Sequence, residues 1–84
     1  MNSANFVKRF IDELGDVKDW YHNGVVNELP LACGLCVCGH QIKFEYYIVN
    51  RKTKETRILG SECIEHFKDY NIELYESLIS SKKS

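Results

Sequence analysis

The chain lacks the features that mark several whole classes of protein. Its 84 residues contain no apolar run long enough to cross a membrane, so we expect no membrane-spanning segment. Residues 1–6 lack the apolar core of a signal peptide, and we therefore expect a cytoplasmic protein that is not secreted. There is no internal repeat and no low-complexity tract, while 44% of the residues are hydrophobic. This composition predicts a single folded domain over residues 1–84.

A large excess of one charge is also missing. The net charge is −1, which argues against a strong non-specific binder of nucleic acid. The charges are nevertheless unevenly spread: residues 31–60 carry five basic and two acidic side chains. The flanking segments, residues 1–30 and 61–84, each carry three basic and five acidic side chains. The middle segment is therefore the part of the chain suited to an anionic partner.

The four cysteines, by contrast, are concentrated in two short clusters. The first spans residues 33–40 and reads CGLCVCGH, and the second spans residues 60–66 and reads GSECIEH. In a reducing compartment, clustered cysteines indicate metal ligands before they indicate disulfides. Structural zinc takes four sulfur or nitrogen ligands in a tetrahedral array. Because a domain of this size has only a modest core, we predict one structural Zn²⁺ ion that stabilises the fold.

Chain spacing restricts which of these side chains can meet at one ion. Cys63 and His66 are three residues apart at the predicted start of a helix, so both lie on one helix face. A helix N-terminus lowers the pKa of a thiol, which favours the thiolate that a metal needs. Gly39, directly after Cys38, allows backbone amides to point at the sulfurs. The predicted ligands are Cys36, Cys38, Cys63 and His66, with Cys33 as the reserve ligand.

Two alternatives remain open for this site. Cys33 and Cys36 have the familiar two-residue spacing of zinc ligands, and they compete with the tighter pair Cys36 and Cys38. An all-cysteine site would leave His66 merely packed against its neighbours. His40 follows the glycine turn, and we expect it to be solvated or to support a ligand rather than to bind the ion.

The spacing of apolar residues predicts an α+β fold that begins with a helical segment over residues 4–22. Apolar side chains between residues 6 and 14 recur at helical intervals, and Gly15 is a natural stop. A second short turn would then carry Trp20 and Tyr21 on one side, where they pack into the core.

Strand signals dominate the middle of the chain. Asn23-Gly24 should break the helical segment, and residues 25–29 form an edge strand or an extended lead that ends at Pro30. Residues 41–50 alternate between two faces, and residues 55–59 return as a second strand. We therefore predict a β-hairpin with a basic tip.

The last third of the chain is predicted to be helical. Ser61 is a suitable N-cap for a helix that includes residues 63–70. Asn71 is placed to cap a final helix, and residues 80–84 read as a frayed polar tail. The side chains expected to face inward from that final helix are Ile72, Tyr75, Leu78 and Ile79.

The order of a cysteine knuckle, a β-hairpin and a helix start resembles the treble-clef zinc finger. The sequence is still more similar to small uncharacterised proteins of phages and large DNA viruses. The matching motifs are Cys36-Val37-Cys38-Gly39, Ile42, Ile48-Val49-Asn50, Gly60-Ser61-Glu62-Cys63-Ile64 and Phe67. The resemblance covers residues 33–70 and implies a treble-clef-like zinc core there, a viral source and a location in the host cytoplasm. It implies little about activity, because fold does not determine function.

Enzymatic interpretations of the two clusters fail on chemical grounds. A nuclease of the ββα-metal type needs a histidine on the hairpin, and residues 42–59 contain none. Residues 33–36 look like a thioredoxin-type motif, but no βαβ pattern surrounds them. Cys63 and His66 lack an orienting acid for nucleophilic catalysis. Too many soft ligands are present for a catalytic zinc with an open position, so we predict a protein without enzymatic activity.

A binding module is the remaining prediction. Four cations gather around the hairpin tip, and the strand alternation places Tyr46 in the core and Tyr47 on the outside. The cations would contact phosphates of a nucleic acid and an exposed tyrosine would stack on a base. The alternative is a protein–protein adaptor or inhibitor that engages a host factor through acidic helical surfaces. The predicted contact residues are Arg51, Lys52, Lys54, Arg57 and Tyr47.

Overall fold

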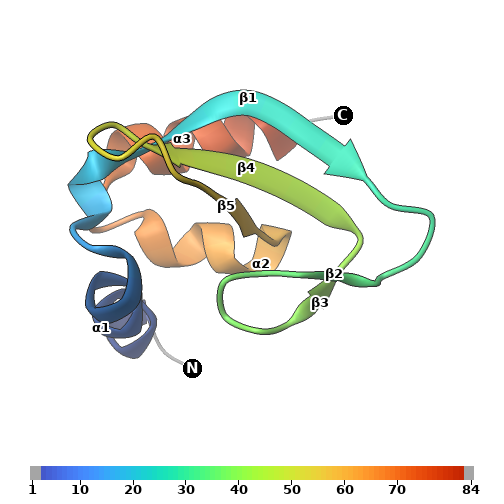
Figure 1. The fold of residues 1–84 in the computed structure, drawn as a ribbon, viewed down its shortest axis with the longest axis horizontal. Helices are drawn as coiled ribbons and strands as arrows, with labels where there is room; N and C mark the ends of the chain where they lie inside the picture. The colour runs from blue at the N-terminus through green and yellow to red at the C-terminus, as the bar shows by residue number, and fades with distance from the viewer. Residues whose placement is uncertain (1–2, 83–84) are drawn as a thin grey trace.

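A three-stranded antiparallel sheet forms the centre of the fold (Figure 1). The computed structural model describes residues 3–82, and the chain folds as α+β. The strands of the central sheet, in spatial order, are β1 (Trp20–Glu28), β4 (Phe44–Asn50) and β5 (Thr56–Leu59). A second, two-stranded antiparallel sheet pairs β2 (Gly34–Leu35) with β3 (Gln41–Ile42). The predicted hairpin is confirmed as β4 and β5, and β1 is an edge strand. The single strand predicted over residues 41–50 is wrong at its start, because residues 41–42 form β3 of the second sheet and Phe44 is exposed.

Three α-helices and two short 3₁₀ turns complete the part of the chain that the structure describes. They are α1 (Ser3–Leu14), η1 (Val17–Asp19), α2 (Ser61–Ile64), η2 (Glu65–Phe67) and α3 (Ile72–Lys82). Helix α1 ends as predicted at Gly15, whose φ of +89° favours glycine. Figure 1 shows α3 running behind β1. Between residues 3 and 82, no helix has the length and apolar character that a membrane crossing requires.

The core lies between one face of the sheet and the helices. Successive strand side chains point to opposite faces, so Tyr46, Ile48 and Asn50 of β4 are all buried on the same side. Leu74 and Leu78 of α3 are buried against this face. The large side chains with less than 2% exposure are Trp20, Phe67, Ile48, Leu59, Ile64, Leu74 and Leu78.

The predicted helical segment over residues 4–22 is right as far as η1 and wrong beyond it. Trp20 and Tyr21 begin β1, where Trp20 pairs with Asn50 across the sheet. Asn23-Gly24 also does not end an element: β1 continues through it with a bulge, and Gly24 has a φ of +84°. Pairing with β4 therefore overrides the local helical spacing, as tertiary contacts commonly do.

The last third follows the prediction in outline and departs from it in detail. The N-cap of α2 is Gly60 rather than Ser61, and it makes no side-chain capping bond. Asn71 caps α3 as predicted, because its Oδ1 accepts from the Leu74 N–H at 3.1 Å. The helix continues to Lys82, so the predicted frayed tail is wrong for residues 80–82, and residues 83–84 lie outside the described part. Ile72 is 52% exposed and Leu74 takes the inward position.

Asn71 also connects the last helix to the first strand. Its side-chain nitrogen donates to the Val17 carbonyl at 3.0 Å and lies 3.4 Å from the Trp20 carbonyl. We expect Asn71→Ala to lower the free energy of unfolding by about 1–2 kcal/mol, because a cap and an interelement hydrogen bond are both lost. Urea denaturation measures this change. The matched control is Asn27→Ala, which removes an exposed amide bonded to Glu45; equal losses in the two variants would contradict the assignment.

Candidate metal centre

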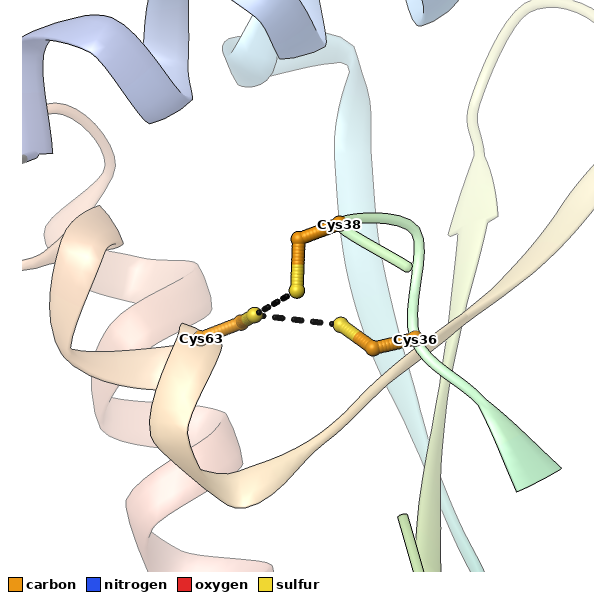
Figure 2. Close-up of side chains that lie close together, drawn as sticks. All are labelled: Cys36, Cys38 and Cys63. Carbon is orange, nitrogen blue, oxygen red and sulfur yellow. Dashed lines mark hydrogen bonds between the residues drawn. The ribbon is translucent and has the colours of Figure 1, made fainter. Parts of the chain in front are cut away.

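Three cysteine sulfurs from two distant parts of the chain meet at one point (Figure 2). Cys36 and Cys38 come from the loop between β2 and β3, which we call the knuckle (residues 36–40), and Cys63 comes from α2. The Sγ of Cys63 lies 3.1 Å from that of Cys36 and 2.8 Å from that of Cys38. All three sulfurs lie within 4.8 Å of one another. Cys36 and Cys63 are only 5% and 3% exposed, so the centre belongs to the core.

Backbone hydrogen bonds fold the knuckle so that two nearby sulfurs can face one point. The Cys36 N–H donates to the His40 carbonyl at 3.0 Å, and the Gly39 N–H donates to the Cys36 carbonyl at 2.9 Å. Gly39 has a φ of +90°, a conformation that a residue with a side chain rarely adopts. The Val37 N–H donates to the Ile58 carbonyl at 3.0 Å and so fixes the knuckle to the edge of β5.

The first turn of α2 brings the third sulfur against the knuckle. The Cys63 N–H donates to the Gly60 carbonyl at 3.1 Å and closes this turn. Gly60 itself is buried, and a Cβ there would overlap the Cγ2 atom of Ile42 and approach the Cβ of Cys36 to 3.7 Å. The close approach of α2 to β3 therefore requires glycine at this position.

The sulfurs share protons unequally. The Cys63 side chain hydrogen-bonds to Cys36 and lowers the pKa of that thiol to about 5, although burial opposes the shift. Backbone N–H groups of Cys38 and Gly60 also bond to Cys36 and lower its pKa further. The pKa of Cys63 is raised, first by its hydrogen bond with Cys36 and then by burial. The pKa of Cys63 therefore shifts in the opposite direction to the lowering predicted for a thiol at a helix N-terminus.

This donor set fits a zinc ion. Zn–S bonds of about 2.3 Å in a tetrahedron place neighbouring sulfurs about 3.8 Å apart. The observed separations of 2.8 and 3.1 Å are shorter, so the sulfurs would move apart by about 1 Å or less to admit the ion. Thiolates repel one another, and close approach of three sulfurs is favourable only with a proton or a cation among them. Soft thiolate ligands select zinc over the harder divalent cations.

Two histidines border the centre. A hollow of about 210 Å³ next to Cys38 and Cys63 is lined by Phe6, His40, Glu62 and His66 as well. His40 Nδ1 lies 3.3 Å from the Cys38 sulfur. The ring of His66 stacks on that of Phe6 in α1, with centroids 4.6 Å apart. Within residues 3–82, the ligand atoms that gather within 4.8 Å of one another are the three sulfurs, and neither imidazole belongs to that group.

The other predicted site residues lie elsewhere. Cys33, the reserve ligand, is exposed and outside the sulfur group. The four predicted cations surround the tip of the β4–β5 hairpin, which Figure 1 shows at the opposite end of the molecule from the β1–β2 loop, whereas Tyr47 lies within β4 opposite Ile58. Tyr46 is buried and Tyr47 half-buried on the opposite face, as the alternation predicted. The hydroxyl of Tyr47 donates to Glu45 at 3.5 Å.

Acidic side chains engage part of the basic tip. Lys52 Nζ lies 3.5 Å from an oxygen of Asp19, and Arg57 forms a 2.8 Å ion pair with Glu55. Hydrogen bonding from Arg57 lowers the pKa of Glu55. Arg51 lies over the ring of Tyr21, with 5.2 Å between its Cζ atom and the ring centroid. The position of Tyr21 beside this tip was missed by the sequence analysis, because residues 20–21 read as helical.

The contact between Gly60 and Ile42 allows a test of how closely α2 packs against β3. We expect Gly60→Ala to destabilise the fold by about 1–3 kcal/mol, because its new methyl group overlaps Ile42. Replacing Ile42 by Ala removes the overlapping atom. Gly60→Ala should therefore cost less in the Ile42→Ala background than in the wild type, a coupling that urea denaturation measures. Equal costs in both backgrounds would show that the approach of α2 to β3 is not tight.

Comparisons with other proteins give no assignment for this centre. No protein-family model, no curated protein and no solved structure matches the chain. Its function therefore has to be argued from the chemistry of its own residues.

Proposed function

We propose that the chain is a non-enzymatic binding module stabilised by one structural zinc ion, which Cys36, Cys38, Cys63 and His66 hold. The observation that carries this proposal is the meeting of three cysteine sulfurs from the knuckle and α2, of which Cys36 and Cys63 are buried and Cys38 is half-buried. When bound, the ion supplies a cross-link between these segments, and its binding free energy contributes to folding. Such a link is valuable in a chain of 84 residues, whose core alone gives modest stability.

His66 is the proposed fourth ligand. It borders the same hollow as Cys38 and Cys63 and lies three residues after Cys63, and the proposal requires its ring to leave the stack on Phe6 for a rotamer that reaches the sulfurs. His40 is its rival, because its Nδ1 already lies 3.3 Å from the Cys38 sulfur. With either histidine bound, all four positions of the tetrahedron are filled by protein, which is the arrangement of a structural rather than a catalytic site.

The proposed architecture is treble-clef-like. The order of knuckle, β4–β5 hairpin and α2 supports this assignment, since the first and last of these supply the three sulfurs. The motif resemblance over residues 33–70 supports a viral accessory protein acting in the host cytoplasm.

Nucleic acid is the proposed partner of the basic hairpin. Around its tip lie four cations, Arg51, Lys52, Lys54 and Arg57, against two acids, Asp19 and Glu55. The ion pairs there are exposed and therefore weak, so phosphate groups can replace the carboxylates at low cost. Docking on a host protein through the acidic helices is the competing function, and no particular contact in the structure favours it.

The zinc proposal predicts different results for the four cysteines. Elemental analysis of purified protein should give about one zinc per chain. Replacement of Cys36, Cys38 or Cys63 by Ala should remove the zinc and the cooperative unfolding transition, because metal binding is coupled to folding. Cys33→Ala is the matched control and should keep both. A wild type that is folded without metal, or a Cys33→Ala variant that loses zinc, would overturn the proposed site.

Measurements of zinc binding also distinguish His66 from His40 as the fourth ligand. We expect His66→Ala to lower zinc affinity more than His40→Ala does, because it removes a ligand, whereas loss of a group that only contacts the Cys38 sulfur costs at most about 10- to 100-fold. Cobalt substitution adds a second readout, since its visible spectrum reports the number of sulfur and nitrogen ligands. The reverse result would assign the fourth position to His40. No effect of either change would leave a three-sulfur site and refute a histidine ligand.

A further inference from the structure

One face of the central sheet is turned away from the helices. Residues opposite each other in an antiparallel pair point to the same face, so the pairings Tyr21 with Val49 and Tyr47 with Ile58 place four apolar side chains together. All four are half-buried, whereas their strand neighbours, such as Ile48, are fully buried. His22, from the buried face of β1, bonds through Nε2 to Ser81 of α3 at 2.7 Å, which places α3 on the other side of the sheet.

The two tyrosines form a pair on this outer face. Tyr21 is opposite Val49, and Tyr47 precedes Val49 by two residues, so the tyrosines are diagonal neighbours on adjacent strands. Such neighbours lie about 7–8 Å apart, within reach for aromatic side chains. The bulge of β1 between His22 and Val26 adjoins Tyr47, and the His22 ring bonds to the Tyr47 carbonyl there. This bond holds the backbone at Tyr47 where the regular ladder is interrupted.

Cations border the tyrosine pair at the hairpin end of the sheet. Arg51 already lies over Tyr21, so the guanidinium and the ring form one stacked unit. The side chain of Lys52 remains 75% exposed despite its ion pair with Asp19. Glu45 accepts a hydrogen bond from the Tyr47 hydroxyl and lies at the other end of the face. The charge distribution therefore suits phosphates along the hairpin tip and disfavours them near Glu45.

We propose that this face, with Tyr21 and Tyr47 at its centre, binds single-stranded nucleic acid. Bases stack on Tyr47 and on the Tyr21–Arg51 unit, while Lys52 and Lys54 contact the phosphates. A single strand is required because the π-faces of bases are accessible to protein rings only where they are not stacked in a duplex. The inference rests on the proposed function. It names single-stranded nucleic acid as the ligand class, and it adds the outer face of the sheet to the basic hairpin as a contact surface.

Ring removal tests stacking separately from charge. The probe is a fluorescently labelled oligothymidine of about twelve nucleotides, which covers the usual site size of a stacking surface. Binding to the zinc-loaded full chain is followed by fluorescence anisotropy. We expect Tyr47→Leu or Tyr21→Leu to weaken binding about tenfold, because leucine keeps apolar surface but cannot stack. Tyr47→Phe and Tyr21→Phe should bind like the wild type. Tyr70→Leu is the matched control, because Tyr70 is 40% exposed and lies outside this face.

Charge removal tests the phosphate contacts. Lys52→Ala combined with Lys54→Asn removes two cations, and asparagine tolerates the φ of +66° at residue 54. The slope of log affinity against log salt should fall by about 1.4, since each phosphate contact with a single strand contributes about 0.7. Zinc content and circular dichroism of every variant establish that its fold is intact. These two readouts do not depend on nucleic acid.

The outcomes separate the inference from the function on which it rests. Loss of binding in the leucine variants, with the phenylalanine variants intact, supports the stacking face. If all tyrosine variants bind equally and only the charge variant binds more weakly, the stacking face is refuted. The contact between nucleic acid and the basic hairpin then still stands. Equally tight binding of a duplex of the same length also overturns it. No binding of any nucleic acid at low salt refutes both the face and the hairpin contact, whereas the zinc site is judged by metal content alone.

Discussion

The meeting of Cys36, Cys38 and Cys63 is the contact on which the rest of this structure depends. It joins a knuckle at one edge of the sheet to the first turn of α2, two segments more than twenty residues apart in the chain. Three sulfurs at this separation repel one another unless a proton or a cation lies among them. Hydrogen bonds link the Cys63 sulfur to those of Cys36 and Cys38. A zinc ion in place of these hydrogen bonds would make the same junction far stronger.

The N-terminal helix extends this junction into the core. Phe6 of α1 stacks on His66 and meets the ring of Phe67 edge-on, with centroids 5.4 Å apart. Phe10, one turn later, packs edge-on against Trp20 of β1. The hollow beside the three sulfurs and the first strand are thus connected by one run of aromatic contacts through α1. A small protein gains from this arrangement, because aromatic side chains bury a large area per residue.

Much of the fold was predictable because its signals are local. The alternation in residues 41–50 identifies β4 and its inward face, and Asn71 caps α3 through a bond to a residue three positions away. The interpretation failed at Trp20 and Tyr21, whose spacing continues the helical pattern of α1. Their strand conformation comes from pairing with residues 49 and 50, almost thirty positions later. Such non-local pairing leaves no periodic trace in the segment itself.

The sequence by itself determined the chemistry of the candidate site: clustered thiols and imidazoles, in two chain-distant groups, with glycines at the turns. Tertiary structure decided which of them meet. Cys33 and Cys36 have a ligand-like spacing, yet only Cys36 faces Cys63, because the knuckle is tied to β5 through Val37 and Ile58. The outer pair of Tyr21 and Tyr47 was likewise set by strand register. Spacing along a chain fixes which groups are available, whereas convergence in space depends on how elements pack.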